Sequence, residues 1–148
     1  MEYEVENNLI STFYIGNTMW GIDIMNTQEV ILIQDITKVY NAPNYIEGII
    51  NLRGRIVTVL SLCKKLNIEP EGDVIDQRII IVNVGDEYLG LLVDKISEVV
   101  EVDKKAIMSS PSTVSGVNGR YINGIYHFNN ITIASLNLDS VLNTEEDE

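Results

Sequence analysis

The chain has 148 residues, of which 45% are hydrophobic, and its formal net charge is −12 at pH 7. An apolar fraction of this size can fill a core and excludes wholesale disorder, whereas the acidic charge disfavours nucleic-acid partners, which need a basic surface. No apolar run approaches the roughly 20 residues that cross a bilayer, and the acidic start, residues 1–6, lacks the regions of a secretory signal. We therefore expect a cytoplasmic protein without direct membrane insertion.

The first half of the chain predicts a series of short β-strands. A flexible N-terminus over residues 1–8 is followed by stretches rich in β-branched and aromatic residues, which are separated by turn residues such as Gly16-Asn17. A short helix should come last, because Ser61 is a good N-cap residue and Leu62 and Leu66 lie on one helical face. The strands are expected at 9–15, 19–24, 29–33, 45–52 and 56–60.

The second half repeats this pattern. Asn137 provides the N-cap of a second short helix. Gly54 and Asn130 occupy matched turn positions, and both residue types tolerate the left-handed backbone that a tight turn needs. The strands are expected at 78–84, 88–93, 98–102, 121–128 and 131–136.

An internal duplication relates the two halves. Residues 13–30 match residues 82–99, and residues 45–67 match residues 121–143. Aliphatic residues coincide easily by chance, so the matched glycines, tyrosines and a Glu-Val pair are the informative positions. A repeat that occurs only twice indicates two pseudo-symmetric subdomains and not a solenoid.

The duplication predicts a fold class and a domain division. We expect a mainly all-β protein of two five-stranded barrels with short terminal helices, since closing a sheet protects its edges. The first barrel is expected over residues 9–72 and the second over residues 73–143, followed by an acidic tail at 144–148.

The strand pair in the first copy resembles a known family. Residues 48–57, GIINLRGRIV, resemble the signature hairpin of the CheW family of chemotaxis proteins, and residues 41–46 resemble its lead-in. Residues 20–24 and 28–30 resemble the first barrel of that family. The resemblance extends over residues 9–142 and implies two SH3-like barrels packed on a shared core.

The resemblance also implies a function. Proteins of this family are adaptors in signal transduction that bind the regulatory domain of the histidine kinase CheA and the cytoplasmic hairpin tip of chemoreceptors. It therefore implies a scaffold of a two-component system that is recruited to membrane receptor arrays, without enzymatic activity, cofactor or metal. An aliphatic groove between the barrels with a few polar anchors would suit a receptor helix.

Four residues are predicted to bind the receptor. The resemblance assigns Arg53 to the receptor contact, and a guanidinium suits acidic or carbonyl groups on receptor helices. It places Glu29 on the same surface, although the matched Glu98 leaves a structural role common to both barrels as an alternative. Gln28 and Thr27 are weaker candidates. No kinase-binding residues are predicted, beyond a possible contribution from the loop at 110–119.

The sequence departs from the usual family pattern at four positions. Thr27 stands where Val is common, which leaves the receptor affinity open. Tyr40 replaces a small residue or Pro, Ser61 replaces a common Asp, and Cys63 stands where Arg is frequent.

Two other functions have to be weighed against an adaptor. Cys63 and His127, the only cysteine and the only histidine, could in principle form the nucleophile and base of a hydrolase. We expect Cys63 to be a small core residue instead. A small barrel could also bind single-stranded nucleic acid, but the net charge of −12 argues against it.

Overall fold

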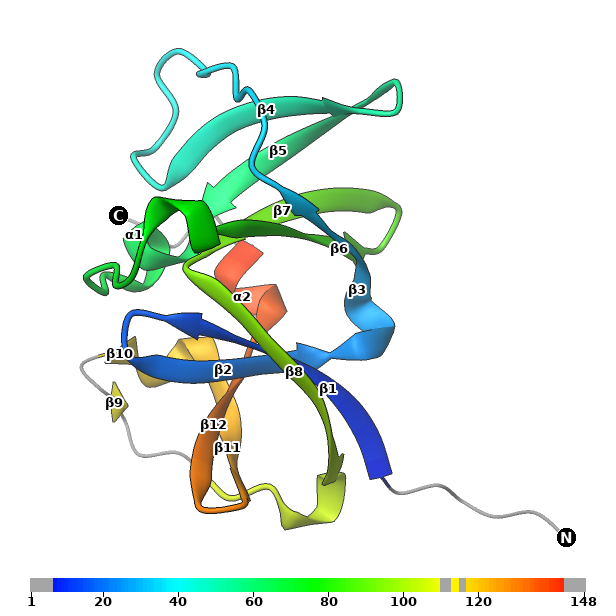
Figure 1. Cartoon of the computed structure of the whole chain (residues 1–148), viewed down its shortest axis with the longest axis vertical. Helices are drawn as coiled ribbons and strands as arrows, with labels where there is room; N and C mark the ends of the chain where they lie inside the picture. Colours follow the sequence, from blue (N-terminus) through cyan, green and yellow to red (C-terminus); the bar gives the residue numbers. More distant parts are fainter. Residues whose placement is uncertain (1–6, 110–112, 115–116, 143–148) are drawn as a thin grey trace, which may run out of the picture.

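The computed structural model describes residues 7–109, 113–114 and 117–142 (Figure 1). Two short α-helices, α1 (Leu62–Leu66) and α2 (Leu138–Leu142), accompany four single-turn 3-10 helices, η1 (Ile24–Asn26), η2 (Val74–Asp76), η3 (Lys104–Ala106) and η4 (Gly119–Tyr121). The strands are β1 (Asn7–Ile15), β2 (Thr18–Asp23), β3 (Thr27–Leu32), β4 (Ile46–Leu52), β5 (Arg55–Ser61), β6 (Arg78–Val84), β7 (Glu87–Val93), β8 (Lys95–Asp103), β9 (Thr113–Val114), β10 (Val117–Asn118), β11 (Ile122–Phe128) and β12 (Ile131–Leu136).

The strands form two five-stranded sheets and one two-stranded sheet of β9 and β10. One large sheet has the order β3-β6-β7-β5-β4, and we call it the central barrel because its strands come from the middle of the chain. The other has the order β11-β12-β2-β1-β8, and we call it the flanking barrel. The strong β pattern in the sequence therefore predicted the mainly-β fold class correctly.

The predicted division of the chain at residue 73 does not coincide with the way the strands are shared between the two barrels. Each barrel takes a hairpin from one copy of the repeat and three strands from the other, so residues 9–72 and 73–143 do not form one barrel each. At the end of β2 the chain turns through η1, which the Asp23 carboxylate caps by accepting a hydrogen bond from the Met25 backbone N–H at 2.9 Å. This turn directs β3 away from β2 and onto β6, while β8 pairs with β1 in the same way (Figure 1).

Each sheet is curled around its own apolar interior. One buried cluster receives side chains from all five strands of the central barrel, and a second receives them from all five strands of the flanking barrel. Strands at opposite edges of a sheet can share one cluster only if the sheet closes on itself. The central cluster includes Ile31, Ile50, Val57, Ile79 and Leu92; the flanking cluster includes Ile10, Met19, Val100, Tyr126 and Ile133.

A third apolar cluster lies between the barrels and joins them. Strand β6 shows how it is built, because Ile79, Ile80, Ile81 and Val82 are all 0% exposed. Successive side chains of a strand point to opposite faces, so Ile79 and Ile81 fill the central barrel while Ile80 and Val82 enter the shared cluster. The expected shared core is therefore present, and both faces of β6 are buried.

The two copies repeat each other in detail. The pairing of β4 with β5 shifts register between Ile46 and Gly48, and β11 and β12 shift at the matched residues. Gly54 and Asn130 have positive φ angles of 83° and 67°, as their turn positions predict. The predicted N-caps are also confirmed: Ser61 accepts from the Lys64 N–H, and Asn137 accepts from the Ser140 N–H, both at 3.2 Å.

Several predicted segments lie partly or wholly outside the described residues. The acidic tail at 144–148 lies outside them, as do residues 1–6 and half of the loop at 110–119 proposed for kinase contact. Strand β1 already begins at Asn7, within the expected flexible N-terminus. Within the part of the chain that the structure describes, no helix has both the length and the apolar composition needed to cross a membrane.

Candidate partner-binding site

Arg53 lies at the tip of the turn between β4 and β5. Its backbone adopts a left-handed conformation with φ of 52°, and the Asn51 carboxamide oxygen accepts a hydrogen bond from the Gly54 N–H at 2.8 Å, which fixes the turn. The side chain is 69% exposed and donates from Nη2 to the Oε2 atom of Glu29. Two residues predicted separately as receptor contacts therefore form an ion pair with each other.

This ion pair spans the seam of the central barrel. Glu29 belongs to β3 and Arg53 follows β4, and these two strands are the opposite edges of the sheet. Beneath the pair, Ile31 and Leu52 pack against the same interior cluster, so the edges approach each other there. The Glu29 side chain is 28% exposed, which leaves the pair accessible at the surface.

The other two predicted contacts point in different directions. Gln28 is exposed. The hydroxyl of Thr27 is buried, and no hydrogen-bond partner for it occurs among the described residues. Thr27 as a whole is half-buried, but its hydroxyl is not available to a partner, and the predicted set of four is only partly brought together at the surface.

Two apolar residues on the same strand were not predicted from the sequence. Val30 and Leu32 are 41% and 65% exposed, and they alternate with the half-buried Glu29 and Ile31. Gln28, Val30 and Leu32 thus form an outward row on an edge strand, beside the ion pair. Alternation along the strand could have revealed this row, but the continuous aliphatic sequence VILI concealed which residues face inward.

Glu98, the counterpart of Glu29, has a different environment. Its side chain is exposed, and its backbone carbonyl accepts a hydrogen bond from the Thr12 hydroxyl. The residue matched to Arg53 is Asn129, which cannot form an ion pair. The two glutamates share a strand position but not a side-chain contact, so the Arg53–Glu29 pair is particular to the central barrel.

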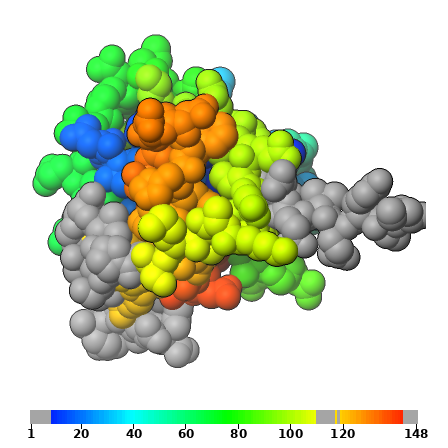
Figure 2. Space-filling view, turned by 90° about the horizontal axis from the view of Figure 1, so that it is seen from below, coloured from blue at the N-terminus to red at the C-terminus, as the bar shows by residue number. Residues whose placement is uncertain are grey.

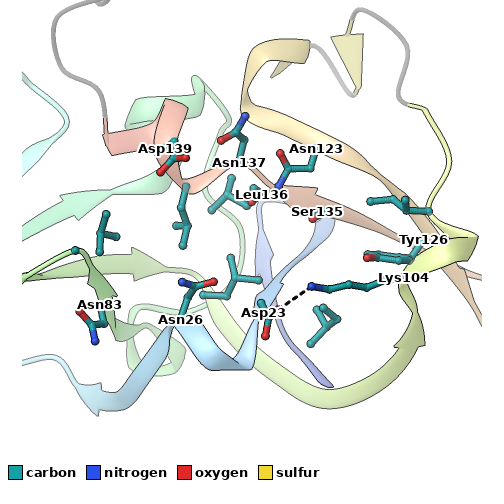
Figure 3. Close-up of a pocket in the computed structure, with 16 residues that line it drawn as sticks. Asp23, Asn26, Asn83, Lys104, Asn123, Tyr126, Ser135, Leu136, Asn137 and Asp139 are labelled. Atoms are coloured by element: carbon teal, nitrogen blue, oxygen red, sulfur yellow. Dashed lines mark hydrogen bonds and ion pairs between the residues drawn. The ribbon is translucent and has the colours of Figure 1, made fainter. Parts of the chain in front are cut away.

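A cavity of about 610 Å³ lies between the barrels (Figure 3). The expected groove was aliphatic with a few polar anchors, but polar side chains are as prominent as aliphatic ones, because loops and strand ends line it. An ion pair of 3.2 Å between Asp23 and Lys104 crosses one side. The polar lining comprises Asp23, Asn26, Asn83, Lys104, Asn123, Tyr126, Ser135, Asn137 and Asp139.

Charged and aromatic groups of the flanking barrel shape one wall of this cavity. Burial raises the pKa of the Tyr126 phenol, and the nearby Asp23 adds to this increase while Lys104 opposes it. The β11–β12 hairpin lies beside the end of β8 and η3, as Figure 2 shows from below, and Met108 bridges to Ile125 there. The wall is thus tied to the barrel by backbone hydrogen bonds.

Cys63 and His127 do not form a catalytic pair. The Cys63 thiol is buried in the shared cluster and donates to Asp94 Oδ1 at 3.3 Å, whereas His127 is exposed on β11 with Nδ1 at 3.3 Å from the Thr132 hydroxyl. Burial, followed by the hydrogen bond to Asp94, raises the pKa of Cys63 from 9.0 to about 12. A thiol that stays protonated is a poor nucleophile, so Cys63 is the core residue that was expected.

The described ranges contain no group of three or more His, Cys, Asp or Glu side chains that could hold an ion.

Comparisons with known proteins agree with the fold and the hairpin. Residues 10–146 match the family model described as CheW-like domain. The chemotaxis protein CheW of Treponema pallidum is 31% identical over 91% of this chain and 82% of its own length, and that of Bacillus subtilis is 30% identical over 92% and 87%. The crystal structure of the scaffolding protein TtCheW from Thermoanaerobacter tengcongensis superposes with a TM-score of 0.89 at 32% identity, covering 100% of this chain and 96% of that one. This chain therefore belongs to the CheW family.

Proposed function

We propose that this chain couples chemoreceptors to the histidine kinase CheA as a non-catalytic scaffold. Membership of the CheW family makes the chain a chemotaxis scaffold or adaptor protein, and its relatives carry the name chemotaxis protein CheW. The observation that carries the finer proposal is the exposed Arg53–Glu29 ion pair beside an apolar edge strand.

The receptor side of the proposal uses this seam. A guanidinium presents five N–H donors, so Arg53 can keep its contact with Glu29 and still donate to carboxylate or carbonyl groups on a receptor helix. Val30 and Leu32 supply apolar area next to it, and Gln28 supplies a polar contact. A helix that presents apolar residues on one face and an acidic residue at their edge would complement this surface.

Thr27 supports the same surface from inside the barrel. It precedes the bulge at which β3 changes register against β6, two residues before Glu29. Because its hydroxyl is buried, we expect the identity of residue 27 to influence receptor affinity through the packing of β3 next to Glu29 and not through a hydrogen bond to the receptor.

The absence of catalysis belongs to the same proposal. Cys63 is protonated and buried, and the exposed His127 is held near a threonine hydroxyl and not near a nucleophile. A scaffold needs only surfaces and a stable core, which is what the barrels supply. Its recruitment to membrane arrays would then come from the receptor and not from a membrane-spanning segment of its own.

The experiment is titration calorimetry with two partners from the same organism, the CheA regulatory domain and a receptor-tip fragment. Arg53→Ala should weaken receptor binding by about tenfold or more, since a charge-assisted hydrogen bond contributes about 1.5–3 kcal/mol. Its affinity for the kinase domain should stay unchanged. Arg120→Ala removes the same charge from η4, which precedes β11, and serves as the control after its folding is checked, because Arg120 also donates to the Tyr121 hydroxyl at 2.8 Å.

Two results would contradict the proposal. A folded sample that gives no heat and no co-elution with either partner would exclude the coupling role. Equal losses of receptor affinity in Arg53→Ala and Arg120→Ala would exclude the seam as the receptor surface while leaving a scaffold role with another contact face.

A further inference from the structure

Asp94 is a buried carboxylate at the junction of three segments. It lies between β7 and β8, is only 4% exposed, and its backbone N–H donates to the Tyr14 carbonyl at 3.1 Å. Its Oδ2 atom accepts from the Gly16 N–H at 2.8 Å and from the Glu71 N–H at 2.9 Å. One oxygen therefore holds the β1–β2 turn and the connection between the two repeats.

The other oxygen is poorly satisfied. Among the described residues, Oδ1 accepts only from the Cys63 thiol, at 3.3 Å, and a thiol is a weak donor. No Lys or Arg of the described residues forms an ion pair with Asp94. A buried carboxylate without a cation is costly, so Oδ1 has capacity for a positively charged donor.

A cavity of about 430 Å³ opens beside this carboxylate. The neighbouring Lys95 contributes instead to a separate cavity of about 210 Å³ that Asp94 also borders. In the larger cavity the one lysine, Lys64, is already paired with Glu47 at 3.0 Å. Glu69 adds negative potential, which contributes to the raised pKa of Cys63.

The walls of the larger cavity favour a flat, weakly hydrated cation. Asn44, Asn67 and Gln77, whose side chains each carry a carboxamide acceptor, line its border, while Ile68 and Leu92 supply apolar wall. A guanidinium is planar, presents several N–H donors and loses its hydration more easily than an ammonium. We propose that this cavity binds a guanidinium group, with Asp94 Oδ1 as its principal acceptor.

The matched half of the molecule lacks this arrangement. The residue matched to Asp94 is Met25, and the residue matched to Cys63 is Asp139. The barrel repeat therefore does not require a buried carboxylate at this place. The site is also separate from the seam at Arg53, so the proposal does not depend on receptor binding.

The test is an NMR titration of the full chain with methylguanidinium chloride, following the backbone amides of Gly16 and Glu71. Saturable shifts of both amides are expected at millimolar concentration, and methylammonium chloride should bind at least about threefold more weakly. The guanidinium group could belong to an arginine within a peptide or to free arginine, and two further ligands distinguish these sources. Binding of both free arginine and Nα-acetyl-arginine methylamide indicates a peptide arginine. Binding of free arginine alone indicates the free amino acid.

The key variant is Asp94→Asn, which keeps the shape of the side chain. Its carboxamide oxygen can still accept from Gly16 and Glu71, while the charge that faces the cavity is lost. Binding should weaken by about tenfold or more, because a charge-assisted bond becomes a neutral one. Asp86→Asn removes the same charge from the exposed β6–β7 turn and should bind like the wild type.

A second variant protects the test against misfolding. Glu69→Gln changes an exposed side chain and should weaken binding by about twofold to threefold through the local potential alone. Absence of saturable shifts in the wild type, or wild-type affinity in folded Asp94→Asn, would overturn the proposal.

Discussion

Arg53 and Glu29 are 24 residues apart in sequence and belong to opposite edges of one sheet, yet their side chains form an ion pair. The contact exists because the sheet closes, so that the turn after β4 reaches the outer side of β3. A surface charge pair of this kind marks the closure of the central barrel.

The ion pair should contribute little to stability. Arg53 is 69% exposed, and exposed pairs typically couple by about 0.2–1 kcal/mol. A double-mutant cycle with Arg53→Ala and Glu29→Ala, followed by urea unfolding, should give a coupling in this range that decreases at about 1 M salt. A coupling above about 2 kcal/mol that is insensitive to salt would contradict an exposed surface pair.

Gly48 should tolerate no side chain. Its φ is 145°, and a Cβ at this position would overlap the carbonyl oxygen of Thr37, which accepts a hydrogen bond from the Ile49 N–H at 2.8 Å. Gly48→Ala should reduce the free energy of unfolding by about 3 kcal/mol. Gly54→Ala is the control, because its φ is also positive but open space surrounds it, and it should lose only about 1 kcal/mol. Similar losses of unfolding free energy in the two variants would show that backbone strain alone, and not the overlap with Thr37, destabilises Gly48→Ala.

Thr27→Val should stabilise the protein. The buried hydroxyl of Thr27 has no hydrogen-bond partner among the described residues, and replacing it by a methyl group removes a desolvation cost of about 1 kcal/mol or more. The midpoint of chemical unfolding should rise. Thr132→Val, at an exposed site where the hydroxyl contacts His127, should instead have an effect within about 0.5 kcal/mol. A lower midpoint for Thr27→Val would mean that the hydroxyl is satisfied.

Ionisation of Cys63 should destabilise the fold at high pH. Its pKa is raised from 9.0 to about 12 by burial and by Asp94, so the unfolded chain loses this proton first. Its contribution is fully present below pH 9.0 and is lost as pH rises towards 12. The free energy of unfolding should fall more steeply in this window for the wild type than for Cys63→Ala. The comparison separates the contribution of Cys63 from that of lysines and tyrosines, which also titrate at high pH but are present in both proteins. Parallel pH profiles would show that the thiol does not titrate with unfolding.

Local sequence patterns were sufficient to predict the strands and helices but not which strands pair with each other. Strand β6 was predicted with its observed bounds, and the caps at Ser61 and Asn137 follow from side-chain chemistry that acts within one turn. The exchange of β3 and β8 between the barrels could not be predicted in this way, because the alternation within a strand is the same whichever strand it pairs with. The first copy turns at η1, which Asp23 caps, whereas the second copy crosses over between β7 and β8 without such a helix, so no local signal common to both copies marks the crossover.

The site was predictable to a similar extent. Family resemblance suggested Arg53 and Glu29 as receptor contacts, but their mutual contact depends on barrel closure, and the burial of the Thr27 hydroxyl depends on the local geometry of β3 next to a bulge. Asp94 was not recognised because its burial results from long-range contacts to Gly16, Cys63 and Glu71. Such contacts leave no periodic signal in the sequence.

The exchange of strands also bears on how the protein was assembled. A polypeptide that held a single copy of the repeat would leave its hairpin and its three following strands without their partners. Two such polypeptides would complete both barrels by swapping strands across a two-fold axis. The present chain thus has the strand arrangement of such a swapped dimer, and the stretch around residue 73 connects its two interlocked halves. A protease that cuts this connection should release no separate fragment until the whole molecule unfolds.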